Sequence, residues 1–179
     1  MDMRIINNFK LKILMVLAAI MAFVGISEAF SQATSVYRIQ SLFIYNFTKH
    51  VKWENTEGSA FTVGIYGNPN AFSEIKANLE KKMAWGKNIE VIEIVSPADL
   101  GRCHIAYMPQ SNKKKILEII DASDFSNTLL VTEDDLMNDG AAISFIFEQS
   151  KMKFKISRTK IEQVGLKVSG SLISMGIPV

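Results

Sequence analysis

The chain has 179 residues, of which 48% are hydrophobic and 21% charged, with 20 basic against 18 acidic side chains. This composition excludes an intrinsically disordered or collagen-like chain, because those classes have fewer apolar residues or a strong compositional bias. The formal net charge of +2 removes the electrostatic reason to expect a nucleic-acid-binding protein, which normally has a basic excess or a basic stripe.

The first thirty residues have the pattern of a secretory signal peptide. Basic residues precede an uncharged apolar run over 13–26. Ser27 and Ala29 then occupy the positions of an A-x-A-like cleavage site, and Ser31 with Ala33 offers a slightly later one. The apolar run is shorter than the roughly 20 residues that cross a bilayer, which disfavours a permanent anchor.

We therefore expect export and cleavage of a signal peptide over residues 1–29, with residue 33 as the alternative end. The product would be a soluble periplasmic protein with one domain over residues 34–179. Cys103 is the single cysteine, so the chain cannot form an intramolecular disulfide. In an oxidising compartment a lone thiol is either buried and inert or pairs between chains, and the apolar neighbours of Cys103 favour burial.

The first half of this domain alternates helical and strand patterns. Apolar residues recur at steps of three and four over 36–51, which predicts a helix with much of its girth buried. Residues 61–66 predict a strand that ends in a tight loop at 67–69. An amphipathic helix is expected over 72–83, and the alternation over 89–95 predicts a half-exposed strand.

The middle of the chain continues this alternation. The short apolar runs at 104–108 and 128–132 are typical of buried central strands. The pattern over 111–122, between them, predicts a helix. Asp134 or Asp135 is expected to cap a following helix.

In the last third of the chain, two strand patterns follow each other without a helix between them. Residues 143–148 and 152–157 predict two strands of a hairpin, joined by a short polar turn. A short helix over 158–164 is expected to end at Gly165, which suits a left-handed C-cap. One or two further helical turns are expected over 169–175.

Helix and strand patterns that alternate and then give way to an antiparallel pair predict an α/β fold. We expect a single-domain three-layer sandwich, in which a mixed sheet of about five or six strands has helices on both faces.

Several segments of the sequence are distinctive in their order and spacing. They are SLFIYNFTKHVKW at residues 41–53, then FTVGIYGNPNAF, CHIAYMPQS, LLVTEDD and a closing segment from residue 140 to 179. In these segments the chain resembles the YfiR-like family of exported bacterial proteins, formerly a domain of unknown function. The resemblance covers most of residues 36–179.

The chain departs from the family pattern at a few positions. Glu54 follows Trp53 where many members have proline, Ser157 stands where asparagine is common, and Gly170 replaces a usual serine. Members with several cysteines use disulfides to hold the domain, which this chain cannot do. A redox-sensing role is therefore not transferred to Cys103.

The resemblance implies a periplasmic α/β domain, often dimeric, that acts by protein contact. The best-understood members restrain a membrane-bound partner that makes cyclic di-GMP, and others occur beside sensor kinases. The resemblance therefore implies a membrane-bound signalling protein, a cyclase or a histidine kinase, as the partner. Since no catalytic residues are established for the family, it implies neither an enzyme nor a cofactor.

The residues themselves give weak signals for catalysis or metal binding. A hydrolase of the α/β type needs a nucleophile elbow such as G-x-S-x-G, and the sequence has none. Cys103 precedes His104, but adjacent strand residues point to opposite faces and cannot pair with each other. A zinc site made of His50, Cys103 and His104 would lack the paired ligand spacing, such as C-x-x-C, that zinc sites usually have. The acidic run at 133–135 lacks the alternating ligand positions of a calcium-binding loop.

Two loops that each follow a predicted strand are the candidate contacts for a ligand or a partner. Their residues are Gly67, Asn68, Pro69, Ser111, Lys113, Lys114 and Lys115. If the strands are parallel neighbours, both loops open on the carboxyl edge where α/β sheets bind ligands, provided that side chains do not fill that edge. The three lysines lie in the first turn of a predicted helix. Either they are only solvated, or this helix N-terminus, with its free amides, binds an anion or an acidic partner.

The apolar stripe of the opening helix is wider than one sheet face usually needs. Its members are Ile39, Leu42, Phe43, Tyr45, Phe47 and Trp53. Burial in the core accounts for most of the stripe, and the surplus can serve a homodimer.

Two functional hypotheses follow. The first is a non-enzymatic periplasmic regulatory protein that holds a membrane-bound signalling partner in one state. The alternative is a ligand-binding accessory protein of an envelope transport or sensor system, which would use the loops at 67–69 and 111–115. A neighbouring gene for a cyclase or sensor kinase would favour the first, and one for an outer-membrane receptor or porter the second.

Overall fold

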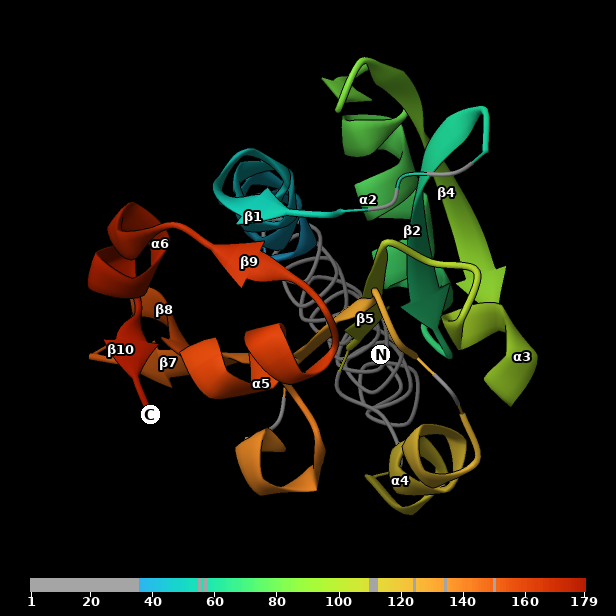
Figure 1. The fold of residues 1–179 in the computed structure, drawn as a ribbon. Coiled ribbons are helices and arrows are strands. Elements are labelled where there is room, and N and C mark those ends of the chain that lie inside the picture. The colour runs from blue at the N-terminus through green and yellow to red at the C-terminus, as the bar shows by residue number, and fades with distance from the viewer. Residues whose placement is uncertain are drawn as a thin grey trace, which may run out of the picture. The chain divides into compact units, whose positions relative to one another are not determined.

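The computed structural model of the protein describes most of the chain from residue 36 to the C-terminus. The described residues are 36–54, 56, 58–109, 113–123, 125–133, 135–149 and 151–179. The expected signal peptide, Ser111 and Asp134 lie outside them. The described part belongs almost entirely to one compact unit, Tyr37–Val179, shown in Figure 1.

Helices and strands alternate along this unit. The first half contains a helix over residues 36–50, β1 (Val51–Lys52), β2 (Ala60–Tyr66), α2 (Pro69–Leu79), β3 (Met83–Ala84), β4 (Lys87–Ile94), α3 (Pro97–Leu100) and β5 (Ile105–Met108). The second half contains α4 (Lys113–Asp121), β6 (Leu129–Thr132), the 3-10 helix η1 (Met137–Asp139), β7 (Ile143–Glu148), β8 (Lys151–Ile156), α5 (Arg158–Gln163), β9 (Lys167–Val168), α6 (Gly170–Met175) and β10 (Ile177–Pro178).

The main sheet has eight strands in the order β10-β8-β7-β6-β5-β2-β4-β3. The strands from β4 through β2, β5 and β6 to β7 run parallel, whereas β8 is antiparallel to β7 and β3 is antiparallel to β4. The α/β class and the mixed sheet are confirmed. The expected number of five or six strands was wrong, because β3 and β10 have two residues each and such short strands leave no periodic pattern.

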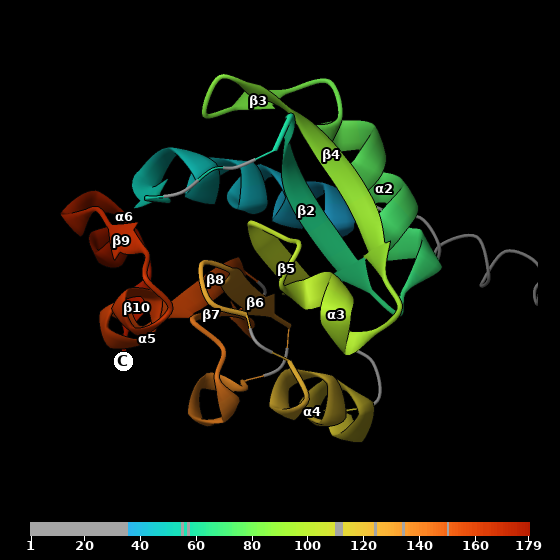
Figure 2. The ribbon, with the colours of Figure 1, turned by 45° about the vertical axis from the view of Figure 1, so that its right-hand side comes forward.

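Alternating side chains of the central strands enter two hydrophobic cores. On β5, Ile105 and Tyr107 belong to the core that includes Phe47 of the helix over residues 36–50. Ala106 and Met108 belong to the second core, together with the buried residues of α3 and α4. Helices therefore cover both faces of the sheet, as expected, and Figure 2 shows the first helix and α4 on opposite sides of it.

Two local predictions differ from the structure. Met83, expected on the second helix, lies in β3, because α2 ends at Leu79 and the chain turns before the strand. Asp135 does not cap a helix: η1 has Leu136 at its N-cap, and Asp135 instead pairs with Lys155 of β8. The hairpin of β7 and β8 and the end of α5 at Gly165, whose φ is +81°, agree with the sequence analysis.

Gly64 occupies a point of close approach in β2. A Cβ at this position would be 2.8 Å from Ile94 Cδ1 and closer still to Cys103 Sγ. We expect Gly64→Ala to lower the free energy of unfolding by about 1–3 kcal/mol, because the second core must shift to admit the methyl group.

Urea unfolding followed by circular dichroism measures this change. Gly170→Ala is the matched control, since nothing lies within 4 Å of the Cβ position at Gly170. Equal effects of the two substitutions would contradict the close approach at Gly64.

Candidate functional site

The two loops singled out from the sequence lie at one edge of the sheet. β2 pairs in parallel with β5, with Val63 opposite Ile105, so the loops that follow these strands share the carboxyl edge. The order of strands reverses at this pair: β4 lies on the outer side of β2, and β6 lies on the outer side of β5. Such a reversal of strand order is the place where open α/β sheets usually bind ligands.

The residues at 67–69 have local structural roles at this edge. Gly67 has a φ of +63°, which suits glycine in the turn after β2. Asn68 caps α2, its Oδ1 accepting hydrogen bonds from the amides of Asn70 and Ala71 at 3.1 and 3.0 Å. Pro69 follows at the first helical turn, where proline is well tolerated.

The lysines lie at the start of α4 and are exposed. Lys113 pairs with Asp139 of η1 at 3.9 Å, and Lys114 and Lys115 share its helical turn. α2 belongs to the first core and α4 to the second, so the two helices leave the edge on opposite faces of the sheet. The ligand-contact roles assigned to both loops stay predictions.

A group of polar side chains, which we call the edge cluster, occupies the carboxyl edge. Its members are Tyr37, Gln40, Asn68, Tyr107 and Glu133. The Tyr107 hydroxyl lies 2.7 Å from Gln40 Oε1 and 3.0 Å from Glu133 Oε1. Gln40 Nε2 donates to Glu133 Oε1 at 2.6 Å, and Asn68 Nδ2 donates to the Tyr37 hydroxyl at 2.9 Å. The first helix is thereby fixed over the edge.

Burial sets the chemistry of the edge cluster. Gln40 and Tyr107 are completely buried. Burial, and then the nearby Glu133 carboxylate, raises the pKa of Tyr107, so this hydroxyl stays protonated and serves as a hydrogen-bond donor. Burial and Glu133 also raise the pKa of Tyr37. The arrangement satisfies buried polar groups, which is a structural use of them.

The two histidines and the cysteine each have a structural partner. His104 Nδ1 accepts a hydrogen bond from the Thr62 amide at 2.9 Å, and burial lowers the pKa of this imidazole. His50 Nδ1 lies 3.1 Å from Ser169 Oγ. Within the described residues there is no cluster of three or more His, Cys, Asp or Glu side chains that could hold a metal ion.

Cys103 is buried in the second core, as its apolar neighbours suggested. Burial raises the pKa of its thiol to about 12. Because the thiolate is the reactive form, we expect a disulfide-exchange reagent to leave Cys103 unmodified in the folded protein at pH 8 and to modify it fully in urea. Rapid modification of the folded protein would contradict this burial.

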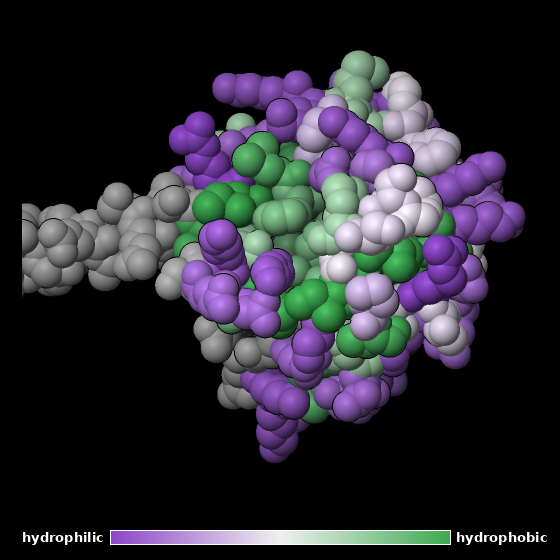
Figure 3. All heavy atoms as spheres, turned by 90° about the vertical axis from the view of Figure 1, so that its left-hand side faces the viewer, coloured by the Kyte–Doolittle hydropathy of each residue, from purple (hydrophilic) through white to green (hydrophobic). Residues whose placement is uncertain are grey.

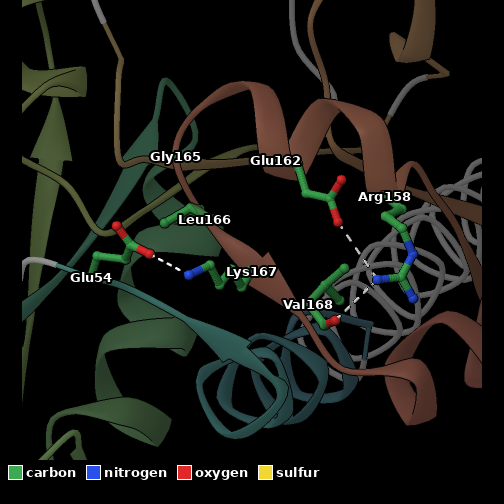
Figure 4. Close-up of a pocket in the computed structure, with 7 residues that line it drawn as sticks. All are labelled: Glu54, Arg158, Glu162, Gly165, Leu166, Lys167 and Val168. Atoms are coloured by element: carbon green, nitrogen blue, oxygen red, sulfur yellow. Dashed lines mark hydrogen bonds and ion pairs between the residues drawn. The ribbon is translucent and has the colours of Figure 1, made fainter.

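A pocket of about 480 Å³ lies between α5, β9 and the segment after β1 (Figure 4). Its charged lining residues form two ion pairs: Lys167 with Glu54 at 2.5 Å, and Arg158 with Glu162 at 3.6 Å. Arg158 also donates to the Val168 carbonyl at 3.4 Å. Among the described residues that line it, the charges balance, and there is no serine, cysteine or histidine.

Large apolar side chains are exposed on the first helix and on the hairpin of β7 and β8. Ile39, Leu42 and Phe147 are 42%, 55% and 61% exposed, and we call these three residues the apolar face. Figure 3 looks onto the side of the molecule that carries β8, β10 and α6 and shows hydrophobic residues gathered there among hydrophilic ones. Exposed apolar residues grouped in this way are typical of a protein contact surface.

The first helix packs directly on the hairpin of β7 and β8. Phe43, on the first helix, lies 5.8 Å from Phe145 and 5.7 Å from Phe154, measured between ring centroids. Phe147 follows Phe145 on the same face of β7, opposite Met152 of β8. Of the wide stripe seen in the sequence, Phe47 and Trp53 are core residues, whereas Ile39 and Leu42 are the exposed surplus.

Residues 37–176 match the family model described as YfiR/HmsC-like (DUF4154). The chain belongs to the YfiR/HmsC-like family. The resemblance seen in the sequence is thereby confirmed over nearly all of the described unit. A search of curated proteins found no match.

A solved structure has a similar fold. It is the crystal structure of a conserved domain protein from Vibrio cholerae O1 biovar El Tor strain N16961. The two chains are 16% identical with a TM-score of 0.53, and the match covers 79% of this chain. This chain spans only 59% of the length of that protein, so the likeness describes the fold alone.

The structure describes the surroundings of the three positions that the sequence analysis noted as departures from the family pattern. Glu54 pairs with Lys167 across the pocket. Ser157 stands at the N-cap of α5 without a side-chain capping bond, and Gly170 begins α6 with open space where a side chain would stand. None of them belongs to the apolar face.

None of the helices in the described part of the chain has the length and apolar character that a bilayer crossing demands.

Proposed function

We propose that this protein is an exported, non-enzymatic regulatory protein that controls a membrane-bound signalling partner by protein contact. The observation that carries the proposal is the family match over residues 37–176. The YfiR/HmsC-like family is periplasmic and non-catalytic and is associated with the regulation of cyclic di-GMP signalling. The partner is accordingly a cyclic di-GMP synthase or a sensor kinase with a periplasmic part.

The apolar face supports this mode of action. Fully burying a side chain such as leucine or phenylalanine stabilises a complex by about 1.5–3 kcal/mol before the cost of association, so three such residues supply a useful hot spot. The face belongs to the rigid first helix and to a hairpin, and both are fixed by aromatic packing against each other. A partner therefore meets a surface that needs little reorganisation.

Export through a cleaved signal peptide is part of the proposal. The basic, apolar and small-residue order of residues 1–29, with 33 as the alternative end, supports it. Cleavage leaves the domain over residues 34–179 in the periplasm, where it can reach the outer side of an inner-membrane protein.

A homodimer through the same surface is a further part of the proposal, because exposed Ile39 and Leu42 would be covered equally well by a second copy. Light scattering on the purified protein tests it. A strictly monomeric mass at high protein concentration would remove the homodimer and leave the apolar face to another partner.

Site-specific photo-crosslinking in cells tests the proposed partner. A crosslinker placed at Leu42 is expected to capture a membrane protein that carries a cyclase or kinase domain. The matched control is a crosslinker at Val95, which is 75% exposed but lies outside the apolar face, after β4. Equal capture from both positions, or capture of proteins without a signalling domain, would overturn the proposal.

A further inference from the structure

The hairpin of β3 and β4 ends in a turn of unusual composition. Ala84 pairs with Lys87, and the two residues between them, Trp85 and Gly86, have φ angles of 54° and 75°. Two positive φ angles are the mark of a two-residue type I′ turn, whose first position normally holds asparagine, aspartate or glycine. A tryptophan is uncommon in this conformation. The turn adjoins β3, the last strand at one edge of the sheet (Figure 2).

The apolar side chains of the turn are exposed in a fixed orientation. Met83 and Trp85 are 57% and 43% exposed, whereas Ala84 between them is buried. Trp85 Nε1 donates to the Thr48 carbonyl at 3.0 Å, and its ring lies 6.4 Å from that of Trp53. One part of the indole is therefore anchored to the first helix while the rest faces outward.

The surroundings of these side chains are basic. Residues 81–88 contain three lysines and no acidic residue. Lys82 Nζ and Lys49 Nζ lie 4.8 and 4.4 Å from the centroid of the Tyr45 ring. Glu80, which precedes this segment, is already paired with Lys76 at 3.3 Å.

These lysines have no carboxylate partner within the part of the chain that the structure describes. None of Lys49, Lys81 and Lys82 forms an ion pair there. Their charge is available to an external anionic surface.

We infer that this tip, defined as Tyr45, Lys49, Lys81, Lys82, Met83 and Trp85, docks on the surface of an anionic bilayer. Tryptophan and tyrosine favour the headgroup level of a membrane, where the ring is half in apolar surroundings and the polar atoms stay hydrated. Lysines around them are attracted by anionic lipids, each strengthening binding about five-fold. An apolar residue such as Met83 adds burial at the boundary of the acyl chains.

The charge pattern and the position of the tip favour a bilayer over an acidic protein. Met83, in the edge strand β3, and Trp85, in the turn after it, are exposed, and Lys81 and Lys82 directly precede them in the sequence. A soft, uniformly anionic surface accommodates such a tip directly. The inference does not rest on the proposed regulatory function, because the tip and the apolar face consist of different residues.

Sedimentation with lipid vesicles tests the inference. The protein is purified in the form that cells make from the full gene and mixed with vesicles of phosphatidylcholine alone or of phosphatidylcholine with phosphatidylglycerol. We expect binding only to the anionic vesicles, and weaker binding as salt is added. The double variant Lys81→Gln/Lys82→Gln is expected to bind about 30-fold more weakly.

The matched control is Lys151→Gln/Lys153→Gln, which removes the same charge from exposed positions of β8. It is expected to bind like the wild type. All variants have the same N-terminal sequence, so any contribution of the apolar run over 13–26 to vesicle binding is the same in each of them. Equal losses in the two double variants, or equal binding to both kinds of vesicle, would overturn the inference.

Fluorescence gives a second measurement that reports on the tip alone. Trp53 is only 2% exposed, so a blue shift of tryptophan emission on adding anionic vesicles is expected to come from Trp85. Trp85→Phe is expected to abolish that shift while circular dichroism shows a folded protein. A shift that persists in Trp85→Phe would place the lipid contact elsewhere and contradict the inference.

Discussion

Phe47→Ala is expected to lower the free energy of unfolding by about 3–5 kcal/mol. Phe47 is completely buried, and its ring lies 5.3 Å from that of Phe154 and 6.0 Å from that of Phe145. Truncation leaves a cavity at the point where the first helix rests on the hairpin of β7 and β8. Urea unfolding followed by circular dichroism measures the loss.

Leu42→Ala provides the control on the same helix. Leu42 is 55% exposed, so its truncation is expected to change the free energy of unfolding by less than about 1 kcal/mol. If Phe47→Ala were no more destabilising than Leu42→Ala, the packing of the first helix against the sheet would be wrong.

The double variant Leu42→Glu/Phe147→Glu is expected to weaken binding of the signalling partner by about 30-fold or more, as for the loss of a hot spot. It replaces two exposed apolar side chains, one on the first helix and one on β7, by charged ones. Because glutamate is a good helix former, the change at position 42 is expected to leave the first helix intact. Binding to the partner captured by crosslinking, measured with purified proteins, gives the change in affinity.

Val95→Glu is the matched control for this variant, because Val95 is an exposed apolar residue outside the apolar face. It is expected to bind the partner as the wild type does. Loss of binding in both proteins, or in neither, would show that the apolar face is not the contact surface.

The sequence predicted the central strands well because their burial leaves a clear pattern. β5 and β6 are short runs buried on both faces, and they stand where the apolar runs at 104–108 and 128–132 placed them. β10 left no such pattern. Its two residues are a strand only because they meet Lys155 and Ile156 of β8, a pairing that depends on the completed fold.

The edge cluster could not be predicted because its members come from separate elements. Gln40 interrupts an apolar helix stripe, and this polar residue at a buried position was the available signal. Its partners, Tyr107 and Glu133, are brought to it by the order of strands in the sheet. Asn68 was correctly placed after the first strand, but its bond to Tyr37 required the position of the first helix.

The apolar face was predicted in part. The width of the helix stripe indicated surplus apolar surface, and the structure identifies Ile39 and Leu42 as that surplus. Phe147 was assigned to a strand, without any indication that it would be exposed. Its exposure follows from its place beyond Phe145, which Phe43 and Phe47 cover.

The first helix links the two proposed surfaces. Ile39 and Leu42 belong to the apolar face, whereas Tyr45 and Lys49 belong to the basic tip with Met83 and Trp85. A protein held at the membrane by the tip would present its apolar face to a neighbouring membrane protein at a raised effective concentration.

The concentration of cyclic di-GMP in cells tests the central claim most directly. It is measured in the bacterium that carries the gene, after deletion of the gene and after complementation with the wild type, Leu42→Glu/Phe147→Glu or Val95→Glu, with export of each protein verified. The account predicts that deletion changes the concentration and that the wild type and Val95→Glu restore it, while the double variant does not. An unchanged concentration on deletion, or full restoration by the double variant, would contradict the account.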